Sequence, residues 1–181
     1  MLFVRKFVKI QDMKGFGFLI LVATVLSCQS PSNEVVSDFT GNETTYDLQS
    51  GSEHAVTGTI SFKERRDGKI TAFVQLSGTS GTARFPVHLH LGDLSTPDAD
   101  IALLLNPVDA ATGRSQTTFS MLSDETTLTY DQLTNLEASV KIHLGETGEE
   151  RNVILAAGNI GASFTKAKPT GRTGIATCKS E

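Results

Sequence analysis

The stretch VTGTISFKERRDGKITAFVQL, residues 56–76, decides the class of fold. Apolar and polar residues alternate on both sides of RRDG at residues 65–68, and a period of two is typical of a half-buried β-strand. An Asp-Gly pair between two such runs predicts a tight turn. The stretch therefore predicts a β-hairpin.

Further short strands are expected after this hairpin. Turns that contain Gly, Pro or Asp separate the candidates, which are residues 84–91, 101–105, 115–122, 139–144 and 152–157. Between them, residues 128–137 have leucines at mixed spacing and predict one helical turn at most. About seven short strands without a long helix predict an all-β fold, which is an antiparallel sandwich or barrel.

The first 27 residues have the layout of a secretory signal peptide. Basic residues precede the apolar run GFGFLILVATVL at residues 15–26, which is shorter than the span of about 20 residues that a bilayer needs. The tripeptide VLS before Cys28 resembles a bacterial lipobox, in which the cysteine carries lipid after cleavage. We therefore expect an exported lipoprotein, anchored in the bacterial cell envelope through Cys28. An ordinary cleavable signal with an incidental cysteine is the alternative.

The rest of the chain is long enough for one domain with a core. Residues 28–52 are rich in Ser, Thr, Asn and acidic residues, which predicts a lipidated N-terminus and flexible tether. A short edge strand at residues 44–48 is the alternative. The sandwich is expected over residues 53–165, and residues 166–181 are expected to form a C-terminal tail or edge strand.

Net charge and cysteine content limit which binding partners and which disulfides are expected. The first 27 residues carry four of the 16 basic and one of the 20 acidic residues, so the remainder has a net charge of −7. Nucleic acid is excluded as a partner because binding phosphates requires a positive surface. With Cys28 acylated, Cys178 has no intrachain partner for a disulfide. The sequence also lacks the GxSxG, P-loop, HExxH, CxxC and dinucleotide-binding motifs.

Three of the four histidines are expected to lie on the outward face of their strands. In FPVHLHLGD, residues 85–93, the apolar residues take one face of the strand, so His88 and His90 take the other face. In SVKIHLGE, residues 139–146, His143 has the same phase. All three are expected to point away from the core, on the outer wall of the sandwich.

Two imidazoles at positions i and i+2 of a strand stand about 6.6 Å apart and can converge on one ion. A third histidine on a neighbouring strand would complete a site for copper or zinc, with ring nitrogens about 3–3.5 Å from one another. His88, His90 and His143 are the predicted ligands. The alternative is that they are solvated surface residues, as is expected of His54.

The acidic loop GDLSTPDAD, residues 92–100, follows the HxH strand. Its three aspartates, Asp93, Asp98 and Asp100, are expected to be solvated. Binding of Ca²⁺, or a carboxylate ligand for the copper, is the alternative.

Three motifs resemble the copper/zinc superoxide dismutases. Their copper-binding strand is similar to FPVHLHLGDLST, and their later copper-ligand strand is similar to VKIH. Their glycine-rich strand is similar to ILAAGNIG at residues 154–161. The CHRD domain, a related module, is similar through HLHLGD, IALLL, TLTYDQL and SVKIHLGETGEERNVILAAG. The two likenesses cover about residues 54–162. They imply a dismutase-like Greek-key β-sandwich or barrel of seven to eight strands, with His88, His90 and His143 as copper ligands.

The chain departs from the dismutase pattern at several positions. Residues 94–142 contain no histidine, so the family's zinc site is missing. Ile154 aligns with the arginine that guides superoxide, with Arg151 three positions away, and Ala157 aligns with the disulfide cysteine. Lys141, in phase with His143, is the nearest cation. Copper binding, with zinc as the second choice, is therefore expected without efficient enzymatic activity, and no catalytic residue is predicted.

Two further interpretations stay open. One is a binding or structural module of the cell envelope that holds no metal. The other is a copper-only dismutase that uses an additional, unidentified ligand.

Overall fold

The computed structural model describes residues 36–97, 99–166 and 174–176. The signal peptide and lipidation predicted for residues 1–28 lie outside these ranges, as do Asp98 and Cys178. No described helix is long and apolar enough to cross a membrane.

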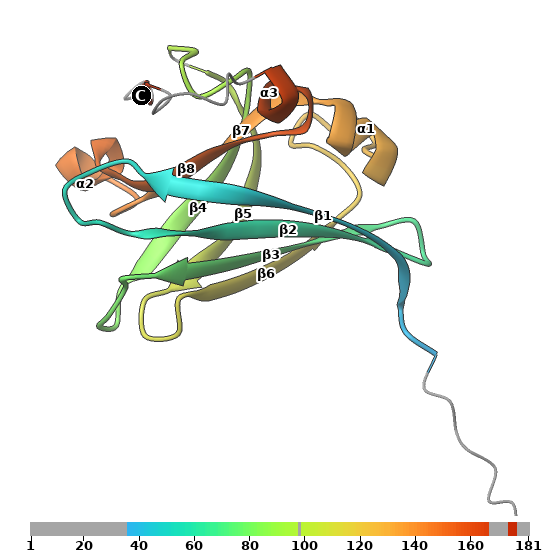
Figure 1. The fold of residues 1–181 in the computed structure, drawn as a ribbon, viewed down its shortest axis with the longest axis horizontal. Coiled ribbons are helices and arrows are strands. Elements are labelled where there is room, and N and C mark those ends of the chain that lie inside the picture. Colours follow the sequence, from blue (N-terminus) through green and yellow to red (C-terminus); the bar gives the residue numbers. More distant parts are fainter. Residues whose placement is uncertain (1–35, 98, 167–173, 177–181) are drawn as a thin grey trace, which may run out of the picture. The chain divides into compact units, whose positions relative to one another are not determined.

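Eight antiparallel strands close into one barrel (Figure 1). The strands are β1 (Phe39–Ser50), β2 (Thr57–Arg65), β3 (Ile70–Ser77), β4 (Arg84–Leu91), β5 (Ile101–Asp109), β6 (Arg114–Phe119), β7 (Glu137–His143) and β8 (Ile154–Ile160). They pair in the order β1-β2-β3-β6-β5-β4-β7-β8, and β8 pairs with β1. The predicted all-β antiparallel fold is confirmed.

The connections have Greek-key form. β4, β5 and β6 pair in sequence, while β3 lies beside β6 and β7 lies beside β4. β7 returns by the long connection of residues 120–136 to flank β4, which gives the Greek key of β4, β5, β6 and β7. This topology brings β4 and β7 together although about 50 residues separate them in the sequence.

Three short helices accompany the barrel: α1 (Tyr130–Asn135), α2 (Gly148–Asn152) and α3 (Gly161–Lys166). The helical turn expected within residues 128–137 is α1. It begins where Thr129 and Gln132 form a reciprocal capping box, which satisfies main-chain N–H groups of the first turn. The other two helices were not predicted, because each has only five or six residues and no apolar periodicity.

The barrel interior is filled by the apolar residues of the alternating pattern. Phe62 and Ile60 on β2 are fully buried, and so are Val87 on β4 and Ile142 on β7. Val87 is the cross-strand partner of Ile142, so the two strands turn the same phase inward. Their other phase, which carries the histidines, therefore lies on the outside of the barrel.

β1 corrects the predicted tether. Phe39–Ser50 forms the longest strand of the barrel and pairs with both β2 and β8, so residues 39–50 are not a flexible tether. The strand was underestimated because few of its residues are apolar and only Tyr46 and Leu48 are buried. Hydrogen bonding to two neighbouring strands stabilises it instead.

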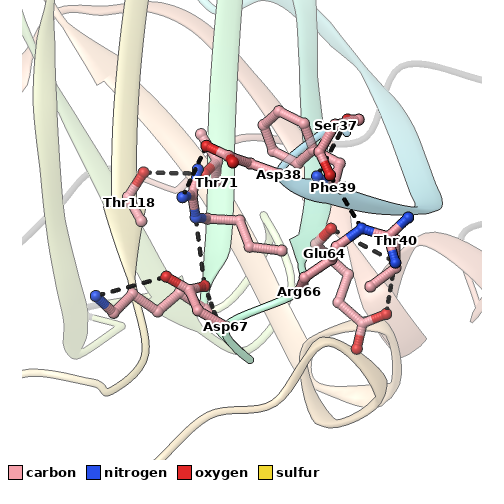
Figure 2. A network of polar contacts seen from close by, with 11 residues as sticks. Ser37, Asp38, Phe39, Thr40, Glu64, Arg66, Asp67, Thr71 and Thr118 are labelled. Atoms are coloured by element: carbon pink, nitrogen blue, oxygen red, sulfur yellow. Dashed lines mark hydrogen bonds and ion pairs between the residues drawn. The ribbon is translucent and has the colours of Figure 1, made fainter. Parts of the chain in front are cut away.

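Hydrogen bonds join the beginning of β1 to the turn of the β2–β3 hairpin (Figure 2). Arg66 Nε donates a 2.9 Å hydrogen bond to the carbonyl oxygen of Ser37, and the Arg66 amide donates one to Asp38. The Thr40 hydroxyl donates a 2.8 Å hydrogen bond to the Glu64 carboxylate. Pairing with β2 and β8 therefore places residues 39–50 in the barrel, which was predicted to begin at residue 53.

The outer face of β4, β7 and β8 is covered by other parts of the chain, and we call it the covered face. Leu94, from the loop after β4, packs there against Ile154, Ala157 and Ile175 in a small second apolar cluster. The Leu94 amide donates a hydrogen bond to the Asn159 side chain, and the Ala176 amide donates one to Leu94. The three strands are consequently buried on both sides.

Candidate metal centre

The three predicted histidines meet on the covered face. His88 pairs with Lys141 across β4 and β7, and His90 pairs with Ser139, which places His143 diagonally opposite His88. The imidazole ring centroids of His88 and His143 are 4.6 Å apart, and His90 lies 5.8 Å from His88 and 6.4 Å from His143. The side chains therefore converge from two neighbouring strands.

One potential ligand nitrogen of each ring lies within 4.8 Å of the others, so the group could hold a metal ion. This spread is looser than the predicted separation of about 3–3.5 Å. Three donors about 2 Å from a shared ion lie about 3–3.5 Å apart. Binding an ion would therefore require the rings to approach by up to about 1–2 Å.

The outer wall on which these histidines lie is closed to solvent. His90 and His143 are 0% exposed and His88 is 8% exposed. They do face away from the barrel interior, as the period-two pattern predicts. Burial comes from the loop after β4 and from α2, whose main-chain atoms reach the rings. The alternative of solvated surface histidines therefore holds only for His54, which is exposed.

Two of the rings are oriented by main-chain carbonyl groups. His90 Nδ1 is 2.9 Å from the carbonyl oxygen of Ala99, and His143 Nδ1 is 2.6 Å from that of Arg151. A carbonyl can only accept a hydrogen bond, so Nδ1 carries the proton in both rings. Nε2 is then the nitrogen with the lone pair, which is the arrangement that ligating histidines usually adopt.

The third ring has an unsatisfied nitrogen. His88 Nδ1 is buried and has no hydrogen-bond partner among the described residues. A buried polar atom without a partner costs about 1–3 kcal/mol, and such an atom calls for an explanation such as a missing ion. The donor set of three imidazoles, with this nitrogen available, fits copper or zinc.

Replacing His88 by Leu is expected to stabilise the metal-free protein by about 1–2 kcal/mol, because the change removes a buried nitrogen without a partner. Urea unfolding of the metal-free protein measures this difference. His54→Leu, at an exposed position, serves as the control and should change stability by less than about 0.5 kcal/mol. A clear loss of stability in His88→Leu would show that the histidine has a structural role.

Burial holds all three rings in the neutral form. It is the main cause that lowers the pKa of His88 to about 3 and that of His90 to about 4, and it also lowers the pKa of His143. For His90 and His143 the hydrogen bond to a carbonyl opposes this shift. Neutral imidazoles are the form that binds a metal ion, so no proton has to be displaced at neutral pH.

The acidic loop does not join the cluster. Asp93 accepts hydrogen bonds from the Ser95 amide and hydroxyl and from the Thr96 hydroxyl, and these bonds lower the pKa of its carboxyl group. Asp100 is exposed. Among the described residues, the cluster of potential ligands contains the three histidines and no carboxylate.

A small pocket of about 100 Å³ borders the site at His88. Arg84, Leu104 and Glu146 also line it, and Leu104 is an exposed apolar residue. The pocket has room for a few water molecules, so it gives small solutes a route to the least buried of the three histidines.

Sequence reasoning missed the groups that orient and bury the rings. Main-chain carbonyls of Ala99 and Arg151 carry no residue-specific signal, because every residue has one. Lys141 was recognised as the nearest cation, but its complete burial was not expected. The buried side of a strand cannot be read from the strand alone when a distant segment covers it.

No protein-family model matches this chain, and no curated protein sequence matches it either.

Proposed function

We propose that this chain is an exported lipoprotein with a superoxide dismutase-like or CHRD-like barrel that binds copper, or zinc, through His88, His90 and His143. Lipid on Cys28 would anchor it in the bacterial cell envelope. Its role there is to hold the metal ion or to give weak redox protection. The sequence features before Cys28 and the motifs around the histidines support the export and family parts of this proposal.

One observation carries the metal part. The three imidazoles converge within 4.8 Å, two of them have Nδ1 directed at main-chain carbonyls, and the third has a buried nitrogen without a partner among the described residues. Each feature is expected of a metal ligand. In a site that binds nothing, the buried His88 nitrogen without a partner would cost free energy.

The residues limit what chemistry the site can support. A bound copper ion would supply one-electron chemistry, and the chain contributes three neutral ligands and a water-poor environment. Of the residues present, none supplies the dismutase zinc site, since residues 94–142 lack histidine. Efficient dismutation is therefore not proposed, although a residual activity of that type is compatible with the small pocket that borders His88.

The alternative function is a binding or structural module of the cell envelope without metal. The eight-stranded barrel, which exposes several loops, is the observation that favours it. In that case the histidines would be remnants of the fold.

Metal content separates the two functions. The full-length chain in detergent is loaded with copper or zinc, freed of excess ion and compared with the variant in which the three histidines are Ala. We expect about one ion per chain in the wild type and none at this site in the variant. His54→Ala is the matched control, because it removes an exposed histidine. All three proteins carry Cys28→Ser and Cys178→Ser, so that no thiol binds the ion. Equal metal content in wild type and triple variant would leave the non-metal module as the function.

A further inference from the structure

Lys141 lies among the histidines of the candidate site. It is the direct cross-strand partner of His88, and it precedes His143 by two residues on the same face of β7. Its side chain is 0% exposed. The ammonium group donates a 2.7 Å hydrogen bond to the carbonyl oxygen of Ala176. A cationic side chain is therefore enclosed beside the three imidazoles.

Burial of a lysine is unusual, because an ammonium group loses its hydration and is normally paired with an anion. The hydrogen-bond partner here is the neutral carbonyl of Ala176, and residues 174–176 lie on the covered face. The segment also packs Ile175 against the small apolar cluster. Several contacts thus hold the ammonium group at a defined place in a poorly hydrated environment.

Two cationic side chains, Lys141 and Arg151, act on the three imidazole rings. After burial, the main cause of the low pKa values, the charges of Lys141 and Arg151 further lower the pKa of His90 and His143, and Arg151 also lowers that of His88. The rings that are oriented by hydrogen bonds face neutral carbonyls rather than carboxylates. Within the described residues, the ligand cluster offers no anionic group to offset a divalent ion.

We propose that the buried ammonium group of Lys141 makes the three-histidine site selective for monovalent copper, Cu(I), over the divalent ions Cu(II) and Zn(II). This inference rests on the proposed metal site. Repulsion by a fixed charge scales with the charge of the ion, so Lys141 opposes a dication about twice as strongly as a monocation. Three neutral ligands leave that repulsion uncompensated for a dication.

Lys141 touches no ion in this scheme and acts only through its charge. It is a specificity-determining residue rather than a ligand, and its effect is to raise the reduction potential of bound copper. A site of this kind retains copper in its reduced form, which fits a holding role better than turnover between two oxidation states.

The test measures the ratio of the affinities for Cu(I) and Cu(II). The full-length chain carries Cys28→Ser and Cys178→Ser in every sample, so that no thiol binds copper. Affinities are determined by competition with chelators, anaerobically with ascorbate for Cu(I) and without reductant for Cu(II). Lys141→Met removes the charge, Lys141→Gln removes it but keeps a hydrogen-bond donor, and Lys141→Arg keeps the charge. Lys63→Met removes a lysine from β2 and is the matched control.

We expect Lys141→Met and Lys141→Gln to lower the Cu(I)-over-Cu(II) ratio by about tenfold, which equals about 59 mV in reduction potential for a one-electron couple. Lys141→Arg and Lys63→Met should keep the wild-type ratio. A wild-type ratio in whichever of the two uncharged variants folds, with copper still bound, would overturn the inference. Absence of copper from the wild-type protein would instead overturn the proposed function itself.

Discussion

The metal-free protein is expected to lose stability steeply as the pH falls from about 7 toward about 4. Burial lowers the pKa of His88 to about 3 and that of His90 to about 4, and it lowers the pKa of His143 as well. In the unfolded chain a histidine titrates near about 6.5. Below about pH 6.5 the histidines of the unfolded chain therefore bind protons, whereas those of the folded protein stay neutral.

This difference in proton uptake determines the direction in which stability changes with pH. The stability contributed by the neutral histidines is fully present above about pH 6.5 and is lost as the pH falls toward the folded pKa values. Within that window, each histidine that stays neutral in the folded protein lowers the free energy of unfolding by about 1.4 kcal/mol for every pH unit of acidification. His88 and His90 together should lower stability by about 2.7 kcal/mol for a drop of one pH unit in that window, and the lowered pKa of His143 adds to the loss. Such a loss is a large part of the 5–15 kcal/mol that is typical of a folded domain.

Urea unfolding of the metal-free protein between about pH 7.5 and about pH 5 measures this slope. His88→Leu should reduce the slope by about 1.4 kcal/mol per pH unit, because it removes a histidine whose pKa burial lowers to about 3. His54→Gln, which replaces an exposed histidine, is the matched control. If His88→Leu and the wild type showed the same slope, His88 would not be neutral in the folded protein.

Gly158→Ala is expected to destabilise the protein by about 2–3 kcal/mol, because it opposes closure of the barrel. A Cβ atom on Gly158 would lie 2.3 Å from the main-chain oxygen of Asp47 and 3.0 Å from the Leu48 side chain. β1 and β8 pair only through Gln49 with Ala157 and Ser50 with Ala156, so the close approach occurs beside a short seam. A shift of β1 that relieves the clash would strain that pairing.

Chemical denaturation measures the loss, and Gly174→Ala is the matched control. A Cβ atom on Gly174 would meet nothing within 4 Å, so this variant should stay within about 0.5 kcal/mol of the wild type. Equal stability of Gly158→Ala and the control would mean that the seam between β1 and β8 adapts without cost.

The local pattern was sufficient to place several strands. Residues 84–91 were predicted as a strand and are β4 (Arg84–Leu91), because alternation of apolar and polar residues between turns specifies both the element and its two faces. The same alternation assigned His88, His90 and His143 to the side away from the barrel interior. Pairing of the strands that carry them was implied only by the family resemblance.

Tertiary structure decided the remaining features of the site. β1 is a strand because β2 and β8 bind its main chain, whereas its own composition is that of a linker. The histidines are buried because the loop after β4, α2 and residues 174–176 cover their face. Side-chain phase depends on neighbours in the sequence, so the amino-acid sequence alone determined which way the imidazoles point. Exposure, ring orientation and the charge beside them depend on segments that are distant in the chain, and only folding brings these together.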